Sequence, residues 1–116
     1  MSYLSAQDRR QRAHGAVDRL QRCLLARGWW SLAEIFAINA VLEFPRSTLR
    51  GRDEIREHLF ARDVRLPALE ARFRHETADP DVLVVEWLAG DHRWADVVRV
   101  GAGGIEVLRS YGHPLA

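Results

Sequence analysis

Three side chains have types and positions that suit acid–base chemistry: Asp96, His58 and His75. Asp96 interrupts an otherwise apolar alternation over residues 92–100. A charged, unpaired carboxylate is costly on such a face, so Asp96 must be paired or protonated. His58 and His75 fall on the inward sides of a predicted helix and strand, and imidazole titrates near neutral pH. We therefore expect Asp96 with a histidine to transfer protons on a small substrate.

A structural role competes with this one. Asp96 could pair with Arg109 or His75 in a buried ion pair, which would also perturb its pKa. Each histidine could equally be a satisfied or solvent-facing residue. The spacing of the three candidates does not match a metal site, and the sequence has no GxGxxG motif. We expect no metal and no cofactor.

A hairpin places Asp96 in register with its neighbours. If Gly90 and Asp91 are the two central residues of its turn, Trp87 lies opposite Trp94 and Val85 lies opposite Asp96. Opposed residues point to the same face, so this face is aromatic and aliphatic with one carboxylate. Its large aromatic area suits a hydrophobic ligand.

The register of the last strand is open between two alternatives. Pairing Val100 with Ile105 would place Asp96 opposite Arg109 and Trp94 opposite Tyr111 on the inner face. A slip of one residue would turn Leu108 and Ser110 inward instead.

The elements that must carry these residues follow from periodicity. Apolar residues at three- and four-residue spacing predict a helix over 5–27, and shorter helices follow around 31–36 and 53–62. Two-residue alternation predicts strands over 39–44, 69–77, 82–89, 92–100 and 105–111, and 46–51 reads as a loop. The strand at 69–77 would turn Phe73 and His75 inward. The order is two helices, a strand, a helix, then four strands in a meander.

Composition excludes several functions. All 17 basic residues are arginines, so there is no Schiff-base or P-loop lysine, and the arginine bias points to a GC-rich, bacterial genome. The net charge is +1 with interspersed signs, which argues against nucleic acid as a partner. Cys23 is the single cysteine, and no apolar run suits a signal peptide or membrane span. We expect a cytoplasmic protein.

Motifs in three segments resemble those of NTF2-like proteins. Residues 28–45 resemble their stretch around L-x-x-L-F-A, residues 49–55 look like their G-R-E-A-I helix entry, and residues 96–111 are similar to their closing hairpin. The resemblance covers nearly the whole chain and is strongest to the SnoaL-like proteins and ketosteroid isomerases. It implies a single domain over 1–116 with a cone-shaped α+β roll, also called cystatin-like. Three helices in the N-terminal half would pack on a curved, mostly antiparallel sheet that encloses a pocket.

By this resemblance, Asp96 matches the protonated Asp of the isomerase oxyanion hole. Phe44 stands where the catalytic base is expected, and no tyrosine lies near residues 21–23, so the ketosteroid isomerase mechanism is not expected. His58 falls at a pocket-lining position and could serve as the base. Polyketide-cyclase-like and epoxide-hydrolase-like members use Asp, His or Arg in such pockets, which adds Arg109 to the candidates.

Two classes of function remain besides an isomerase, lyase or cyclase acting on an apolar carbonyl compound. The chain could be a non-catalytic module that binds a hydrophobic ligand, or a protein–protein interaction module. The sequence leaves open whether the chain is an enzyme. The expected ligand-binding residues are Phe44, Trp87, Trp94, Arg109 and Tyr111. The outer sheet face, with Val84, Leu88 and Val97 among charges, is expected to form a homodimer.

Overall fold

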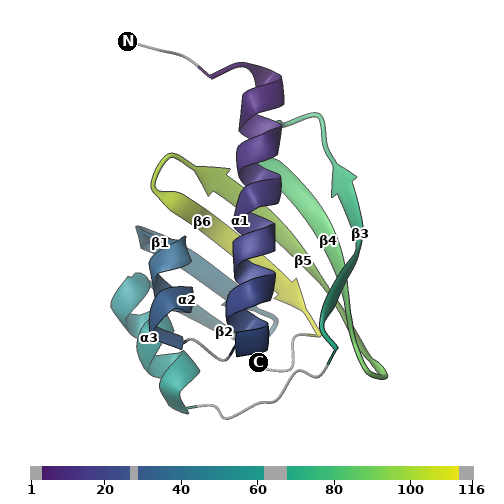
Figure 1. Cartoon of the computed structure of the whole chain (residues 1–116). Coiled ribbons are helices and arrows are strands. Elements are labelled where there is room, and N and C mark those ends of the chain that lie inside the picture. Colours follow the sequence, from purple (N-terminus) through teal and green to yellow (C-terminus); the bar gives the residue numbers. More distant parts are fainter. Residues whose placement is uncertain (1–3, 27–28, 62–67, 113–116) are drawn as a thin grey trace.

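Helices packed on one curved, mixed sheet make up an α+β fold (Figure 1). A computed structural model of the chain describes residues 4–26, 29–61 and 68–112. The helices are α1 (Ala6–Ala26), α2 (Trp29–Ile35) and α3 (Arg52–Ala61). The strands are β1 (Phe36–Phe44), β2 (Ser47–Arg50), β3 (Glu70–Glu76), β4 (Val82–Ala89), β5 (His92–Gly101) and β6 (Gly104–Tyr111).

The long helix α1 covers one face of the sheet, which we call the inner face (Figure 1). It begins next to Ser5, whose hydroxyl accepts a hydrogen bond from the Asp8 amide at 3.0 Å, a typical N-cap. Its buried residues recur at three- and four-residue spacing, as the sequence predicts: Ala13, Ala16, Val17, Leu20 and Leu24. The opposite face of the sheet, which no helix in the described residues covers, is called the outer face.

The sheet has six strands in the order β2-β1-β6-β5-β4-β3. β1 and β6 run parallel, and the other neighbouring pairs are antiparallel. The predicted meander of four strands, β3 to β6, is confirmed. The prediction of a loop over 46–51 is wrong, because Ser47–Arg50 forms the edge strand β2 against β1. This strand is short and mostly exposed, so it lacks the apolar alternation that marks a strand in a sequence.

A glycine sets the position of β6 beside β1. Gly104 has φ 115°, and a Cβ atom there would overlap the carbonyl oxygen of Ile35. Only glycine combines this backbone conformation with so close an approach. The contact brings β6 against the start of β1 and so places the β6 side chains next to those of β1.

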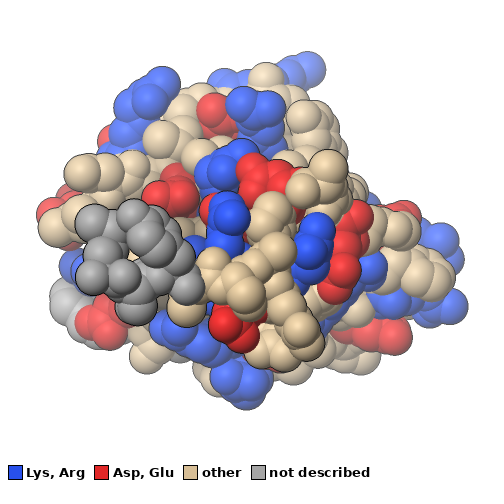
Figure 2. Space-filling view, turned by 90° about the horizontal axis from the view of Figure 1, so that it is seen from above, with Lys and Arg blue, Asp and Glu red and all other residues tan. Residues whose placement is uncertain are grey.

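Ion pairs tie the N-terminal part of α1 to the turn between β3 and β4. Arg9 donates from Nε and Nη2 to Asp81 at 2.9 and 2.7 Å, and Arg99 donates to Asp79 at 2.9 Å. On the face seen in Figure 2, basic and acidic side chains lie beside one another and leave no extended region of one sign. Among the described residues, no helix has the length and apolarity that a membrane span requires.

Candidate functional site

The candidate site begins with a row of side chains on neighbouring strands of the inner face. Val85 of β4 lies opposite Asp96 of β5, and Trp87 opposite Trp94, so the predicted register of this hairpin is confirmed. Asp96 lies opposite Ser110 of β6. We call Phe44, Ser110 and Asp96 the inner row: Glu43 is in register with Arg109, and so Phe44 of β1 follows beside Ser110.

Asp96 is the carboxylate with the least solvent contact in the described chain, at 1% exposure. Its Oδ1 lies 2.5 Å from the Ser110 hydroxyl, and its Oδ2 accepts a hydrogen bond from Trp87 Nε1 at 3.0 Å. Burial raises the pKa of Asp96 from 3.8 to about 7, because no water solvates the charged form. Hydrogen bonds from Ser110, Trp87 and Trp94 oppose this rise without cancelling it. At neutral pH the protonated and ionised forms are therefore both populated.

No arginine or histidine faces Asp96 in the described residues. Arg109 instead lies on the outer face, where its Nε donates to Glu43 at 2.6 Å. Val100 pairs with Ile105 as the first predicted register has it, but Arg99 pairs with Val107, so Glu106 is an extra residue in β6. Beyond this bulge the first register is wrong and the second is right, with Leu108 and Ser110 inward. Tyr111 is consequently 57% exposed rather than inside the pocket.

His75 also lies on the outer face, so the prediction that it points inward is wrong. A bulge in β3 falls between Ala71, opposite Trp87, and Phe73, opposite Glu86. The extra residue is Arg72, and it reverses the alternation of the rest of the strand. His75 Nε2 lies 2.6 Å from Glu86 Oε2, and both side chains are exposed. A structural pair of His75 with Asp96 is excluded by the same geometry.

His58 lies beside the inner row. Its ring packs on the ring of Phe44 with centroids 5.7 Å apart and planes tilted by 34°. Phe44 is buried, and it contributes to a largely apolar pocket of about 320 Å³ with Pro45, Arg46, Ser47 and Gly112. Gly112 follows Ser110 by two residues, so this pocket opens next to the Phe44 end of the inner row.

Trp87 and Trp94 form the wall behind Asp96. Both are buried, with ring centroids 6.0 Å apart and planes 14° from parallel. Trp87 both fills the core and holds Oδ2 of Asp96. Two indoles and a serine thus surround one carboxyl group with neutral donors, an arrangement that tolerates both protonation states.

Sequence reasoning gave Ser110 only as part of an alternative register, although it is the closest partner of Asp96. The sequence signal for an inward Ser110 was its place in the last strand. It lies on the same face as Leu108 and two residues before Gly112. A bulge of one residue decides between Ser110 and Arg109, and periodicity cannot locate it. No group of three His, Cys, Asp or Glu side chains among the described residues could hold a metal ion.

Solved structures with the same fold include enzymes and proteins without an assigned activity. An NTF2-like protein of unknown function from Burkholderia xenovorans LB400 has a TM-score of 0.73 at 12% identity, over 89% of this chain and 84% of that one. An LEH-like epoxide hydrolase from M. tuberculosis has a TM-score of 0.69 at 19% identity, over 89% and 84%. A protein with a ketosteroid isomerase-like fold from Catenulispora acidiphila DSM 44928 has a TM-score of 0.67 at 14% identity, over 83% of each chain.

Identities this low establish a common fold and no common activity. Among curated proteins, none matches the sequence significantly. The model of the SnoaL-like domain matches residues 17–110, from within α1 to Ser110 of the inner row. This chain belongs to the SnoaL-like domain family.

Proposed function

We propose that this protein binds a small, largely apolar carbonyl compound over the inner row and rearranges it by acid–base chemistry of the isomerase, lyase or cyclase type. The observation that carries the proposal is Asp96, a buried carboxyl group with a pKa raised to about 7 and no ionic partner among the described residues. An acid of this pKa can donate a hydrogen bond at neutral pH and accept the proton back.

Asp96 of the inner row and His58 beside it are the two groups for the two halves of such a reaction. Asp96 in its protonated form would donate to the carbonyl oxygen, directly or through the Ser110 hydroxyl. His58, on the Phe44 side, would take the proton from the carbon next to the carbonyl. The negative charge that develops on the oxygen is stabilised by the Asp96 proton, and His58 returns its proton to carbon. The pocket of about 320 Å³ beside Phe44, on which the His58 ring packs, is the space next to this row in which a small ligand would bind.

Hydrogen–deuterium exchange at carbon tests this proposal without requiring the natural substrate. We would incubate the protein in D₂O with 2-tetralone, an apolar ketone with acidic α-protons, and follow loss of the α-proton signals by NMR. The wild type should accelerate exchange over buffer, and Asp96→Asn and His58→Gln should each reduce the acceleration at least tenfold. Gln11→Ala, an exposed change on α1 away from the pocket, is the control and should leave it unaltered. Equal exchange in wild type and Asp96→Asn would overturn the proposal.

A non-catalytic binding role is the second candidate, and a specific observation favours it. Phe44 replaces the base that ketosteroid isomerases are expected to have, and both oxygens of Asp96 already have protein partners. In this case 2-tetralone would shift amide resonances around the inner row without any gain in exchange. The same NMR samples therefore separate an enzyme from a ligand carrier.

We also propose that a second copy of the chain covers the centre of the outer face. Val84 and Val97 are opposed there and half-buried, with Arg109 of β6 across from Val97. Sedimentation equilibrium should give twice the monomer mass for the wild type and the monomer mass for Val97→Asp. A wild type that is monomeric at all concentrations would contradict the dimer and would leave the acid–base proposal unaffected.

A further inference from the structure

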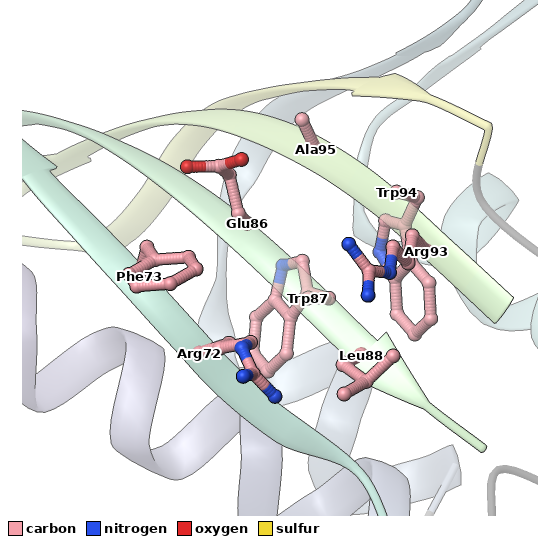
Figure 3. A pocket seen from close by; sticks show the side chains of 8 residues that line it. All are labelled: Arg72, Phe73, Glu86, Trp87, Leu88, Arg93, Trp94 and Ala95. Atoms are coloured by element: carbon pink, nitrogen blue, oxygen red, sulfur yellow. The ribbon is translucent and has the colours of Figure 1, made fainter. Parts of the chain in front are cut away.

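A separate pocket of about 250 Å³ lies where the β3 bulge meets the β4–β5 hairpin. Figure 3 shows its lining from the three strands: Arg72, Phe73, Glu86, Trp87, Leu88, Arg93, Trp94 and Ala95. Register places Phe73, Glu86, Leu88, Arg93 and Ala95 on the outer face. The pocket therefore opens on the side of the sheet that faces away from the inner row.

Two arginines of this pocket differ from the arginines that are held in ion pairs elsewhere in the fold. Arg9, Arg74, Arg99 and Arg109 each form an ion pair. Arg72 and Arg93 form none with any described residue. The one carboxylate in the lining, Glu86, is already held by His75 at 2.6 Å. The pocket thus presents two guanidinium groups and one carboxylate, so its lining carries a net positive charge and neither arginine is in an ion pair with a described residue.

An apolar surface lies beside this charge. Phe73 is a large aromatic residue with 52% exposure, and the Arg72 guanidinium carbon lies 5.6 Å from its ring centroid. Leu88 is half-buried opposite Arg93. An exposed aromatic ring next to uncompensated arginines is the arrangement that holds a planar ring on one side and an anion on the other. The bulge creates it, because without the extra residue Phe73 would face inward.

We propose that this pocket binds a small planar aromatic carboxylate, with the carboxylate on Arg93 and Arg72 and the ring against Phe73 and Leu88. Arginine matches a carboxylate through paired N–H donors, which favours this anion over a spherical one. The volume lies just below the roughly 300–1,000 Å³ of drug-sized sites, which restricts the ligand to one or two fused rings. Trp87 and Trp94 border both sites, but Arg72, Arg93 and Phe73 do not contact the inner row, so the site would exist whether or not the inner row is catalytic.

Titration calorimetry with 2-naphthoate and its uncharged analogue 2-naphthamide tests the proposal on the full chain. The wild type should bind 2-naphthoate at least tenfold more tightly than 2-naphthamide. Raised salt should lower the affinity for 2-naphthoate and leave that for 2-naphthamide unchanged. Arg93→Gln and Arg72→Gln should each weaken 2-naphthoate at least fivefold. Arg22→Gln is the matched control, because Arg22 is exposed on α1 and forms no ion pair with described residues. Both pocket arginines are exposed, so the variants should keep the wild-type thermal midpoint.

Two further variants locate the ligand. Phe73→Ala should weaken 2-naphthoate and 2-naphthamide alike, and Glu70→Gln should tighten 2-naphthoate slightly, since Glu70 lies in register with Leu88 on the same face. Asp96→Asn should leave the affinity unchanged. Loss of binding in Asp96→Asn, equal binding of the two probes, or no response to Arg93→Gln would each overturn the proposal. No detectable binding of 2-naphthoate at millimolar concentration would overturn it as well.

Discussion

Two carboxylates close to the same sheet, Asp96 on β5 and Asp81 just before β4, each accept side-chain hydrogen bonds on both oxygens, and their pKa values move in opposite directions. The pKa of Asp81 is lowered from 3.8, chiefly by the hydrogen bonds from Arg9. The pKa of Asp96 is raised to about 7, chiefly by burial. Both carboxylates are hydrogen-bonded; the charge of the donors and the access of water differ.

The comparison indicates that neutral donors orient a buried carboxyl group without fixing its charge. Ser110 and Trp87 satisfy both oxygens of Asp96 and still leave the protonated form accessible at pH 7. Arg9 and Arg12 hold Asp81 in the ionised form. A group that must change protonation needs the first environment, and a group that fastens a helix to a turn needs the second.

Removing the indole of Trp87 should have the largest effect. Trp87 is 2% exposed, so Trp87→Ala should lower the free energy of unfolding by about 3–5 kcal/mol, measured by urea denaturation. Trp87→Phe retains most of the packing and deletes only the donor to Asp96. It should cost less and raise the pKa of Asp96 further. If the two variants were equally unstable, the hydrogen bond rather than packing would dominate at this position.

The pH dependence of stability should separate the two carboxylates next. The folded pKa of Asp96 lies above its unfolded value of 3.8, so the folded state binds a proton more tightly than the unfolded state. The stabilisation of the folded state by this proton is complete below pH 3.8. Stability should fall as pH rises from about 4 through about 7, by up to about 1.4 kcal/mol per pH unit. Urea midpoints of the wild type between pH 4 and 8 should show this slope, and those of Asp96→Asn should not. A flat wild-type profile would mean that Asp96 is solvated or paired.

Ser110→Ala should give a smaller loss. It removes the hydroxyl 2.5 Å from Asp96 Oδ1 and leaves this oxygen without a described partner, which should cost about 1–3 kcal/mol in urea denaturation. Because the Ser110 hydrogen bond lowers the pKa of Asp96, its loss should raise that pKa above the wild-type value in a carboxyl-carbon NMR titration. An unchanged pKa would show that Ser110 does not contact the charged form. Ser47→Ala, on the exposed strand β2, provides the control for the loss of a hydroxyl.

Asp81→Asn should have the smallest effect at neutral pH, because its ion pairs with Arg9 and Arg12 are only partly buried, so they contribute little and salt screens them. The contribution of Asp81 to stability changes with pH in the opposite direction to that of Asp96. The pKa of Asp81 is lowered on folding, so its contribution is present above 3.8 and is lost as pH falls through the folded value. The variant should therefore differ from the wild type above pH 4 and converge with it in acid. A difference that persists at the lowest pH and in high salt would place the effect in packing instead.

The sequence predicted best where local signals agree. A two-residue turn at Gly90 and Asp91 and the alternation on both sides of it set the β4–β5 register, so the facing positions of Trp87, Trp94 and Asp96 are confirmed. Both errors of orientation have one cause. A single extra residue in β3, and another in β6, reverses every side chain beyond it, which moved His75, Arg109 and Tyr111 to the outer face.

The sequence therefore predicted the acid of the candidate site, Asp96, but not the residues that surround it. Asp96 could be found because a lone carboxylate in an apolar strand has few physical explanations. Ser110 could not be chosen over Arg109, since the choice depends on a one-residue bulge between β5 and β6 that periodicity does not locate. The contact of His58 with Phe44 depends on how α3 docks on β1, a tertiary detail that helix periodicity does not contain.

The bulge in β3 has a further consequence for the behaviour of the protein at high concentration. β3 is an edge of the sheet, and an exposed, regular edge is a template on which another chain can add a strand. The extra residue interrupts the regular pairing of the strand, which also carries the exposed charged residues Glu70, Arg72 and Glu76. The other edge, β2, is only four residues long. Both edge strands, β3 and β2, thus disfavour the addition of further strands that leads to fibrils.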